Sequence, residues 1–203
     1  MSLPARLLDS IASAAVREGL ADAVYTRLAT PIGTLLVIQG ERGVVRVGFE
    51  DEPADRLLAA VAARLGPRIV ASDRELAHTR DVLSAYFEGE DQRLDLPVDL
   101  ALVRSPFRRS ALTTLRDEVG PGQVVTYGGL AAKVGHPRAA RAIGSACATN
   151  PVPIIVPCHR VVPGSGGVGS YAGGPERKRR LLAHEDAVVP AGAASARTPR
   201  PTA

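Results

Sequence analysis

The sequence predicts an α+β protein in which a small domain with a short β-sheet precedes a mainly helical domain. Segments rich in β-branched residues lie at residues 23–29, 33–39 and 44–49, and a turn over residues 40–43 separates the last two. Beyond residue 102 the strongest local signals are those of helices. Because strand signals and helix signals occupy different parts of the chain, we expect an α+β architecture of two packed domains.

Helix signals flank and follow the strands of the first domain. Residues 1–22 form an extension whose apolar side chains recur at helical spacing. Residues 54–65 have the pattern of a helix, residues 69–71 of a short strand, and residues 74–87 of a second helix. Nothing between residues 23 and 102 has catalytic spacing, so we expect this domain to support the second one.

The second domain is expected to span residues 103–186 and to begin with a helix at Ser105-Pro106. A capping hydroxyl followed by proline is a typical helix start. Two short helices follow, at residues 126–134 and 138–149, and the tight turn between them contains Gly135. Such a pair indicates a helix-turn-helix.

The end of the chain contains a glycine-rich run, a basic helix and a tail. Residues 163–174 suit a loop that lets a flat base approach the backbone. Residues 176–186 are expected to form a helix, and the run from Arg177 to Arg180 within it is interpreted as a solvated face, with contact to phosphate as the alternative. Residues 187–203 are rich in Ala, Pro, Arg and Thr and are expected to be a disordered tail.

Charge divides the chain in the same place as the predicted fold. Residues 1–102 hold 11 Arg against 16 Asp and Glu, whereas residues 103–186 hold 12 Lys and Arg against 5 acids. The second half therefore suits a polyanion such as nucleic acid, although a solvated surface would have the same charge.

Other features of the composition exclude some classes of protein. No apolar run is long enough to span a membrane and no secretory segment is recognisable, so a cytoplasmic location is expected. The two cysteines, Cys147 and Cys158, are too few for a disulfide framework, and no Cys/His cluster has zinc-site spacing. We expect no metal and no cofactor.

The most informative stretch runs from Asn150 to Val162 and places Cys158 beside His159. Three prolines in its apolar part predict a stiff, extended and largely buried segment. Only a thiolate attacks carbon efficiently, and an adjacent imidazole can remove the thiol proton, directly or through water. Alone, such a pair could also be a core cysteine and a core histidine.

This stretch resembles the active-site signature of the O6-alkylguanine-DNA alkyltransferases, which contains a Pro-Cys-His-Arg core. The likeness runs from about residue 105 to residue 185 and more loosely back to Tyr25. It implies transfer of an alkyl group from O6-alkylguanine in double-stranded DNA onto Cys158, with O4-alkylthymine as a second candidate substrate. Each molecule would act once, as a monomer, and dock in the minor groove through its helix-turn-helix.

The resemblance also implies roles for individual residues. His159 would deprotonate Cys158 through water, Glu185 would support His159, and Asn150 would pin the turn before the active site. Tyr127 would help rotate the target nucleotide and donate a proton or a hydrogen bond to the leaving guanine, while Arg141 would fill the gap in the duplex. Two further sets complete the expected site: DNA contacts at Thr126, Gly144, Ser145 and Ala146, and a substrate pocket formed by Pro153, Val161, Val168, Tyr171 and Ala172.

Each of these assignments has a simpler alternative. Glu185 and Arg141 could be ordinary solvated helix residues, Tyr127 a half-buried core aromatic, and Cys147 is expected to be core packing. Glycines at 128, 129 and 144 indicate that another backbone comes close, either DNA or the first domain.

Two functions from other classes also remain open. The chain could be a non-enzymatic protein that only binds alkylated DNA, although such proteins lack the acceptor cysteine that Cys158 supplies. It could instead be a cysteine hydrolase, but adjacent residues rarely form a hydrolytic dyad and no oxyanion-hole motif is evident.

Overall fold

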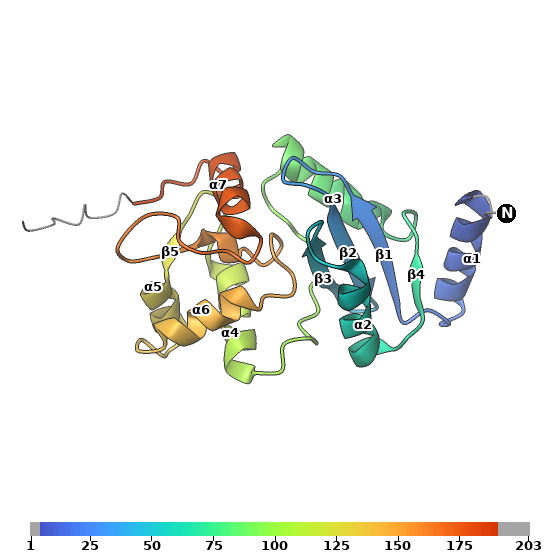
Figure 1. The fold of residues 1–203 in the computed structure, drawn as a ribbon, viewed down its shortest axis with the longest axis horizontal. Helices are drawn as coiled ribbons and strands as arrows, with labels where there is room; N and C mark the ends of the chain where they lie inside the picture. The colour runs from blue at the N-terminus through green and yellow to red at the C-terminus, as the bar shows by residue number, and fades with distance from the viewer. Residues whose placement is uncertain (1–4, 191–203) are drawn as a thin grey trace, which may run out of the picture.

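The computed structural model describes residues 5–190, which fold into two adjoining halves (Figure 1). The first half contains a four-stranded sheet with helices around it, and the second half is mainly helical. The predicted α+β class is thus confirmed. Most of the predicted tail lies outside the described residues.

The sheet consists of β1 (Ala23–Leu28), β2 (Leu35–Gly40), β3 (Gly43–Phe49) and β4 (Ile69–Ala71) in the order β3-β2-β1-β4. The first three strands pair antiparallel, and β4 pairs parallel with β1. The β2–β3 turn requires glycine at position 43, where φ is 124° and a Cβ atom would lie 2.3 Å from the Pro97 carbonyl oxygen.

Each face of this sheet is buried against a different partner. One face, which includes Leu36, Ile38 and Val45, packs against α2 (Ala54–Leu65). The opposite face contributes Val37 and Val47 to the main core of the protein. That core is shared with α3 (Ala77–Glu88) and with buried residues of the second half, so the two halves are joined by one apolar interior.

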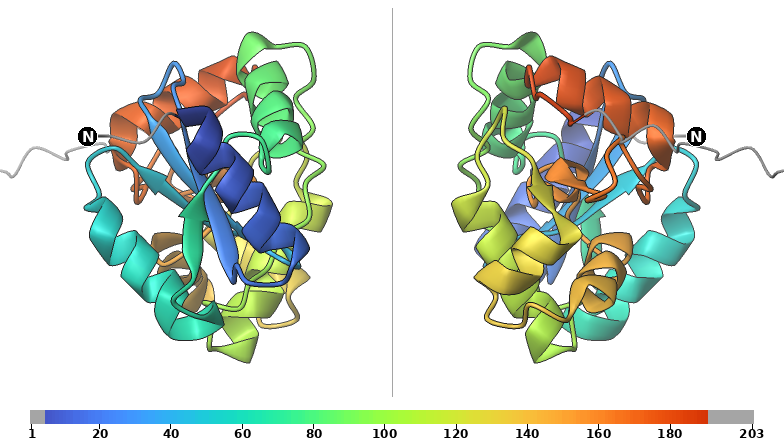
Figure 2. Two further views of the ribbon diagram at one scale, coloured as in Figure 1. Left: turned by 90° about the vertical axis from the view of Figure 1, so that its right-hand side faces the viewer. Right: turned by 90° about the vertical axis from the view of Figure 1, so that its left-hand side faces the viewer.

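The amino-terminal extension forms α1 (Ala5–Arg17), which lies beside β4 at the far end from the second half (Figures 1 and 2). The hydroxyl of Ser13 donates to Glu75 over 2.5 Å, and the hydroxyl of Ser72 donates to Asp9. These bonds attach α1 to the segment that joins β4 to α3. The helix therefore sits away from the half that contains both cysteines.

The second half is built from four helices, two very short strands and one turn of 3₁₀ helix. In chain order these are α4 (Pro106–Glu118), β5 (Val125–Thr126), α5 (Tyr127–Lys133), α6 (Ala140–Ala148), η1 (Cys158–Arg160), β6 (Val161–Val162) and α7 (Gly174–His184). Helices α4, α5 and α6 pack together, and Ser105 caps α4 by accepting from the Arg108 amide as the sequence predicts.

The parallel pairing of β5 with β6 determines the layout of the site. Val125 lies opposite Val161, and Thr126 lies opposite Val162. Strand β5 leads directly into α5, and β6 directly follows the turn that carries Cys158. The first residue of α5, Tyr127, is thereby brought close to Cys158.

Candidate active site

Cys158 is the first residue of η1 and is held by the side chain of Asn150. The Nδ2 group of Asn150 donates to the Val156 carbonyl at 2.8 Å and to the Cys158 Sγ atom at 3.1 Å. Its Oδ1 atom accepts from the Val152 amide at 3.0 Å. One buried side chain thus fixes both the turn before the cysteine and the position of the sulfur.

The segment between Asn150 and Cys158 is not extended, and the prediction on this point is wrong. Pro153 and Val156 form an isolated bridge around a turn, in which Ile154 has φ 76°. An isoleucine at positive φ is strained, and such a conformation persists only where its surroundings impose it. Here the Asn150 hydrogen bonds and complete burial of the turn impose it.

A cavity of about 150 Å³ reaches the Cys158 thiol from the surface. Cys158 itself is only 3% exposed, but the exposed residues Ala148, Ser170 and Ala172 stand at the rim. The remaining lining residues come from α5, α6 and the glycine-rich loop: Tyr127, Gly144, Cys147 and Tyr171. The cavity therefore opens between the helix pair and this loop.

This lining agrees with only part of the expected substrate pocket. Tyr171 and Ala172 line the cavity as expected, whereas Pro153, Val161 and Val168 do not. Pro153 and Val161 are buried in the interior instead, because they belong to the turn and the strand that carry the cysteine. Cys147 was expected to be core packing alone, but it also lines the cavity.

Burial raises the pKa of the Cys158 thiol to about 11. The Asn150 hydrogen bond, the nearby Lys178 ammonium and the bond from the Cys158 amide all act in the opposite direction. The thiol is therefore protonated at neutral pH in this structure, so a reaction at sulfur needs a base to remove its proton.

The imidazole of His159 is fully buried and is supported by Glu185. Its Nε2 atom lies 3.0 Å from Glu185 Oε1. Arg160 donates to both oxygens of the same carboxylate, from Nε at 2.9 Å and from NH2 at 2.8 Å. Glu185 is 2% exposed, which excludes the alternative that it is an ordinary solvated helix residue.

These contacts set the charge states of the two groups. Burial raises the pKa of Glu185, but hydrogen bonds from His159 and Arg160 outweigh it and leave the pKa well below its ordinary value. Burial lowers the pKa of His159, while the Glu185 carboxylate partly opposes that change. A neutral imidazole beside an ionised carboxylate is an arrangement that can accept a proton.

The second ring nitrogen of His159 is available for such a proton. Nδ1 is buried and has no hydrogen-bond partner among residues 5–190. The tautomer with a proton on Nε2 donates to Glu185 and leaves Nδ1 as an acceptor. The ring of Tyr171 packs edge-on against His159, with centroids 6.4 Å apart.

Lys178 corrects the interpretation of the basic helix as a solvated face. Its side chain is completely buried, and Nζ donates to the carbonyl oxygens of Val161 at 2.6 Å and Ser170 at 3.2 Å. The guanidinium of Arg177 donates hydrogen bonds to the Ile32 carbonyl and the Asp51 carboxylate of the first half. Only Arg179 and Arg180 are exposed, and they pair with Glu176.

The helix pair presents a mixed surface to solvent. Arg141 is exposed, and none of residues 5–190 holds its guanidinium by a hydrogen bond or an ion pair. The Thr126 hydroxyl caps α5 by accepting from the Gly129 amide, and Ser145 accepts from Arg108. Ala146 is 1% exposed and packs in the core, so its side chain is not available to DNA, contrary to expectation.

The glycines of these helices are not explained by contact with the first half. A Cβ atom at position 128 would meet nothing within 4 Å, and one at position 144 would make only an ordinary contact with the ring of Tyr127. At position 129 the nearest atoms belong to Thr126 and Val125 of the same half. Contact with the first domain therefore does not account for these glycines.

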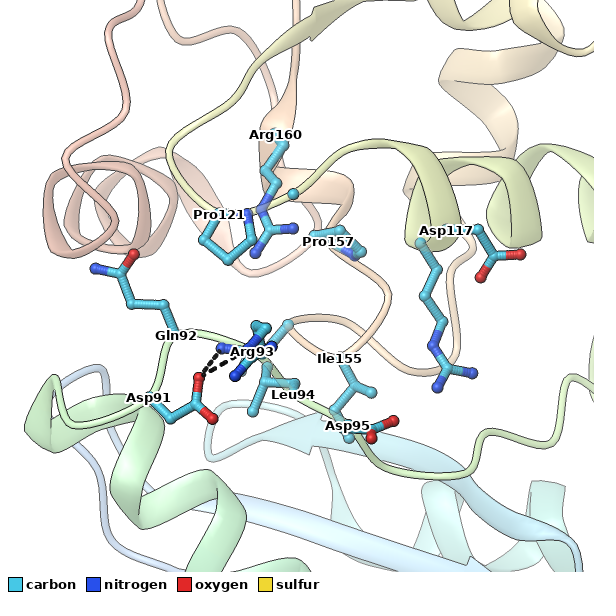
Figure 3. Close-up of a pocket in the computed structure, with 13 residues that line it drawn as sticks. Asp91, Gln92, Arg93, Leu94, Asp95, Asp117, Pro121, Ile155, Pro157 and Arg160 are labelled. Carbon is cyan, nitrogen blue, oxygen red and sulfur yellow. Dashed lines mark hydrogen bonds and ion pairs between the residues drawn. The ribbon is translucent and has the colours of Figure 1, made fainter.

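A larger cavity of about 530 Å³ lies behind the active-site turn (Figure 3). It is lined by Ile155, Pro157 and Arg160 on one side and by the 91–95 segment of the first half on the other. It includes neither cysteine, and its basic and acidic side chains are present in equal number. We place the chemistry at the smaller cavity, which contains the thiol.

Among residues 5–190, no group of three or more His, Cys, Asp and Glu side chains is arranged to hold a metal ion. No helix in this part of the chain has the length and apolar character needed to cross a membrane.

Comparison with known proteins identifies the family. The family model described as "6-O-methylguanine DNA methyltransferase, DNA binding domain" matches residues 106–187, and the ribonuclease-like domain of the same family matches residues 23–100. The chain belongs to the 6-O-methylguanine DNA methyltransferase family. Both halves of the structure are thus assigned, and α1 lies outside the matched ranges.

Relatives in this family are similar over most of their length. The methylated-DNA–protein-cysteine methyltransferase of Shigella flexneri is 39% identical over 164 residues, which cover 78% of this chain and 93% of that protein. The human protein of the same name is 39% identical over 168 residues, covering 79% of each chain.

Solved structures of the family have the same fold. The O6-methylguanine methyltransferase of Mycobacterium tuberculosis superposes with a TM-score of 0.70 at 31% identity, covering 81% of this chain and 93% of that one. The structure described as M. tuberculosis OGT in complex with DNA gives 0.68 at 32% identity, covering 80% and 92%.

Sequence reasoning missed the roles of three residues of this site, and one of them had left a signal. Lys178 shares a helical face with Leu181 and Leu182, so its burial could have been inferred from spacing. Arg160 holds both oxygens of Glu185, but from the sequence it was recognised only as part of the motif. Tyr86 lies 99 residues from Glu185, to which it donates, and no local pattern connects them.

Proposed function

We propose that this protein repairs DNA by moving the alkyl group of O6-alkylguanine in the duplex onto Cys158. The observation that carries the proposal is a thiol held by Asn150 at the end of a cavity that opens beside the α5–α6 pair. Membership of the methyltransferase family supports the same reaction.

The chemistry is a displacement at carbon. The Cys158 proton passes to Nδ1 of His159 through a bridging solvent molecule, and Glu185 stabilises the resulting imidazolium. The thiolate then attacks the alkyl carbon, so that the carbon–oxygen bond breaks as the carbon–sulfur bond forms. The guanine leaves with the bonding electrons and takes up one proton.

Tyr127 is positioned to act on the leaving base. It lines the cavity with Cys158, and burial followed by the nearby cysteine sulfurs raises the pKa of its phenol. A protonated phenol at this position can donate a hydrogen bond or a proton to the departing guanine. We therefore retain its proposed role in the reaction.

A base inside a duplex cannot reach the cavity, so the target nucleotide must rotate out of the stack. Arg141 is the exposed and unpaired cation of α6 that we propose fills the gap. Glycines 128 and 144, which leave space on the helix surface, support close approach to the minor groove. The thioether on Cys158 is stable and none of the other residues that line the cavity is placed to remove it, so we propose that each molecule acts once. We also propose that the protein acts as a monomer.

The proposal is tested by mass spectrometry of the intact protein after incubation with a duplex that contains one O6-methylguanine. We expect the mass of one methyl group to be gained once per molecule, on Cys158. A matched duplex with O4-methylthymine measures the range of substrates. Equal methylation of the Cys158→Ala variant would refute the assignment, and continued turnover would indicate a hydrolase instead.

A further inference from the structure

One tyrosine of the first half reaches into the active site. Tyr86 lies near the end of α3, is completely buried, and donates from its hydroxyl to Glu185 Oε1 over 2.7 Å. The contact joins residues 99 positions apart, from opposite halves of the protein. The proposed reaction gives this hydroxyl no role.

We propose that Tyr86 is a positioning residue that sets the basicity of His159 through Glu185. The first half of the protein would then contribute one group to the relay rather than serve as support alone. This inference rests on the proposed function, because it assumes that His159 accepts the thiol proton.

The hydrogen bonds around Glu185 give the physical reason. Its Oε1 atom accepts from Tyr86, from His159 and from Arg160, at distances between 2.7 and 3.0 Å. A carboxylate that shares its charge among three donors attracts each of them less. The Tyr86 bond therefore weakens the hold of Glu185 on an imidazolium at His159 and helps keep the imidazole neutral.

The phenol can only act as a donor here. Burial, and then the neighbouring Glu185 carboxylate, raise the pKa of Tyr86 far above its ordinary value. Its hydroxyl therefore keeps its proton at neutral and acidic pH. It affects His159 without titrating itself.

Other charged and titratable groups around the pair stay in place when the hydroxyl is removed. Arg160 of η1 holds both carboxylate oxygens, and Lys178 of α7 lies close enough to His159 to act on its charge. Tyr171 and Cys158 complete the surroundings on the cavity side. Because Arg160 alone holds Glu185 at two atoms, the carboxylate keeps its orientation without Tyr86.

Packing of the Tyr86 ring can be separated from its hydroxyl. The ring makes edge contacts with Phe87 and His184, both with centroids 5.0 Å apart, and the Tyr86 carbonyl oxygen lies beside His184 Nε2. The Tyr86→Phe variant preserves all of these contacts and removes only the bond to Glu185. Tyr25→Phe, in β1 on the α2 side of the sheet, is the matched control.

The experiment compares wild type, Tyr86→Phe and Tyr25→Phe in two measurements over pH 4.5–8. The first is the rate of methyl transfer, and the second is the ¹⁵N NMR titration of His159 in the unreacted protein. We expect Tyr86→Phe to raise the pKa of His159 by about half a unit, a modest change for one hydrogen bond to a charged partner. At pH values below the pKa of His159, methyl transfer by Tyr86→Phe should be about threefold slower than by wild type, and above pH 7.5 the two rates should be nearly equal.

The outcomes separate this inference from the proposed function. Tyr86→Phe could give the same His159 titration curve, and the same transfer rates at acidic pH, as wild type and Tyr25→Phe. In that case Tyr86 has only a packing role and the inference fails. A His159→Ala variant tests the relay itself. If that variant has the wild-type rate and pH profile, His159 is not the base and the proposed mechanism fails first.

Discussion

The Nδ2 group of Asn150 lies 3.1 Å from the Cys158 sulfur and 2.8 Å from the Val156 carbonyl. The same side chain accepts from the Val152 amide, so it links the turn, with its strained Ile154, to the thiol. This one amide therefore affects both the position and the pKa of the thiol.

Replacement of Asn150 by alanine should raise the pKa of the Cys158 thiol and slow alkyl transfer. The hydrogen bond to sulfur lowers this pKa, so its loss leaves the effect of burial less opposed. The rate of alkylation by iodoacetamide as a function of pH measures the change, in a Cys147→Ala background where Cys158 is the one remaining cysteine.

The same substitution should destabilise the protein. It leaves the Val156 carbonyl and the Val152 amide without their Asn150 bonds inside the core, and each unsatisfied buried group costs about 1–3 kcal/mol. Gln123→Ala, which removes an amide from an exposed turn, is the control for both measurements. Wild-type thiol reactivity and stability in Asn150→Ala would contradict the role given to this side chain.

Lys178→Met should also raise the Cys158 pKa and loosen the glycine-rich loop. The Lys178 ammonium lowers that pKa, and it ties the Ser170 carbonyl of the loop to that of Val161 beside the site. Methionine keeps the apolar chain length without the charge. Hydrogen exchange of residues 163–174 and the iodoacetamide profile report the two effects.

The control for Lys178 is its neighbour Arg179, which is exposed and pairs with Glu176. Arg179→Met removes a cation from the same helix but from its solvent side. Overlapping profiles for the two variants would mean that Lys178 acts through general helix charge and not through its buried contacts.

Glu185→Ala should cost about 3–5 kcal/mol of stability at pH 7, because it leaves the buried Arg160 guanidinium without its partner. The folded-state pKa of Glu185 is lowered, so its contribution is present above the ordinary value of 4.5 and is lost as the pH falls further. Urea unfolding at pH 7 and at pH 3 measures it.

We expect the stability difference between wild type and Glu185→Ala to shrink from pH 7 to pH 3. Glu176→Ala, which removes an exposed carboxylate from α7, should change stability little at either pH. An unchanged difference at the two pH values would show that the carboxylate charge is not the source of the stabilisation.

Local signals predicted the helices and the four-stranded sheet well, but not the two-residue strands β5 and β6. Helix α2 (Ala54–Leu65) has the predicted bounds because Pro53 and Gly66 mark its ends and apolar residues recur between them. The turn before Cys158 was mispredicted because proline favours extended neighbours, whereas the Asn150 side chain imposes a turn from a distance.

The site could be predicted from sequence only where a motif carries it. Cys158 and His159 are adjacent, and the resemblance supplied Glu185 and Asn150. The contact of Tyr86 with Glu185 could not be predicted because the two residues lie 99 positions apart, in different halves of the protein. Arg160 was quoted only as part of the motif, since a buried arginine that holds the relay carboxylate cannot be told from a surface cation by spacing.

Arg141→Ala should weaken repair of duplex DNA far more than reaction with the free base O6-benzylguanine. Arg141 is exposed on α6 and unpaired among residues 5–190, so its loss should not disturb the thiol. Extruding a base costs a few kcal/mol, part of which a side chain in the gap can offset. A share of about 1.4–2.8 kcal/mol corresponds to a 10- to 100-fold slower reaction on duplex.

The decisive quantity is the ratio of the two rates. Free O6-benzylguanine needs no extrusion, so its rate should stay near wild type in Arg141→Ala. Arg180→Ala serves as the control, because it removes an exposed cation from α7. A proportional loss on duplex and free base would place Arg141 in the chemistry or in folding. If Arg141→Ala and Arg180→Ala both react slowly with duplex DNA and both recover the wild-type rate at low salt, Arg141 contributes only general attraction for phosphate.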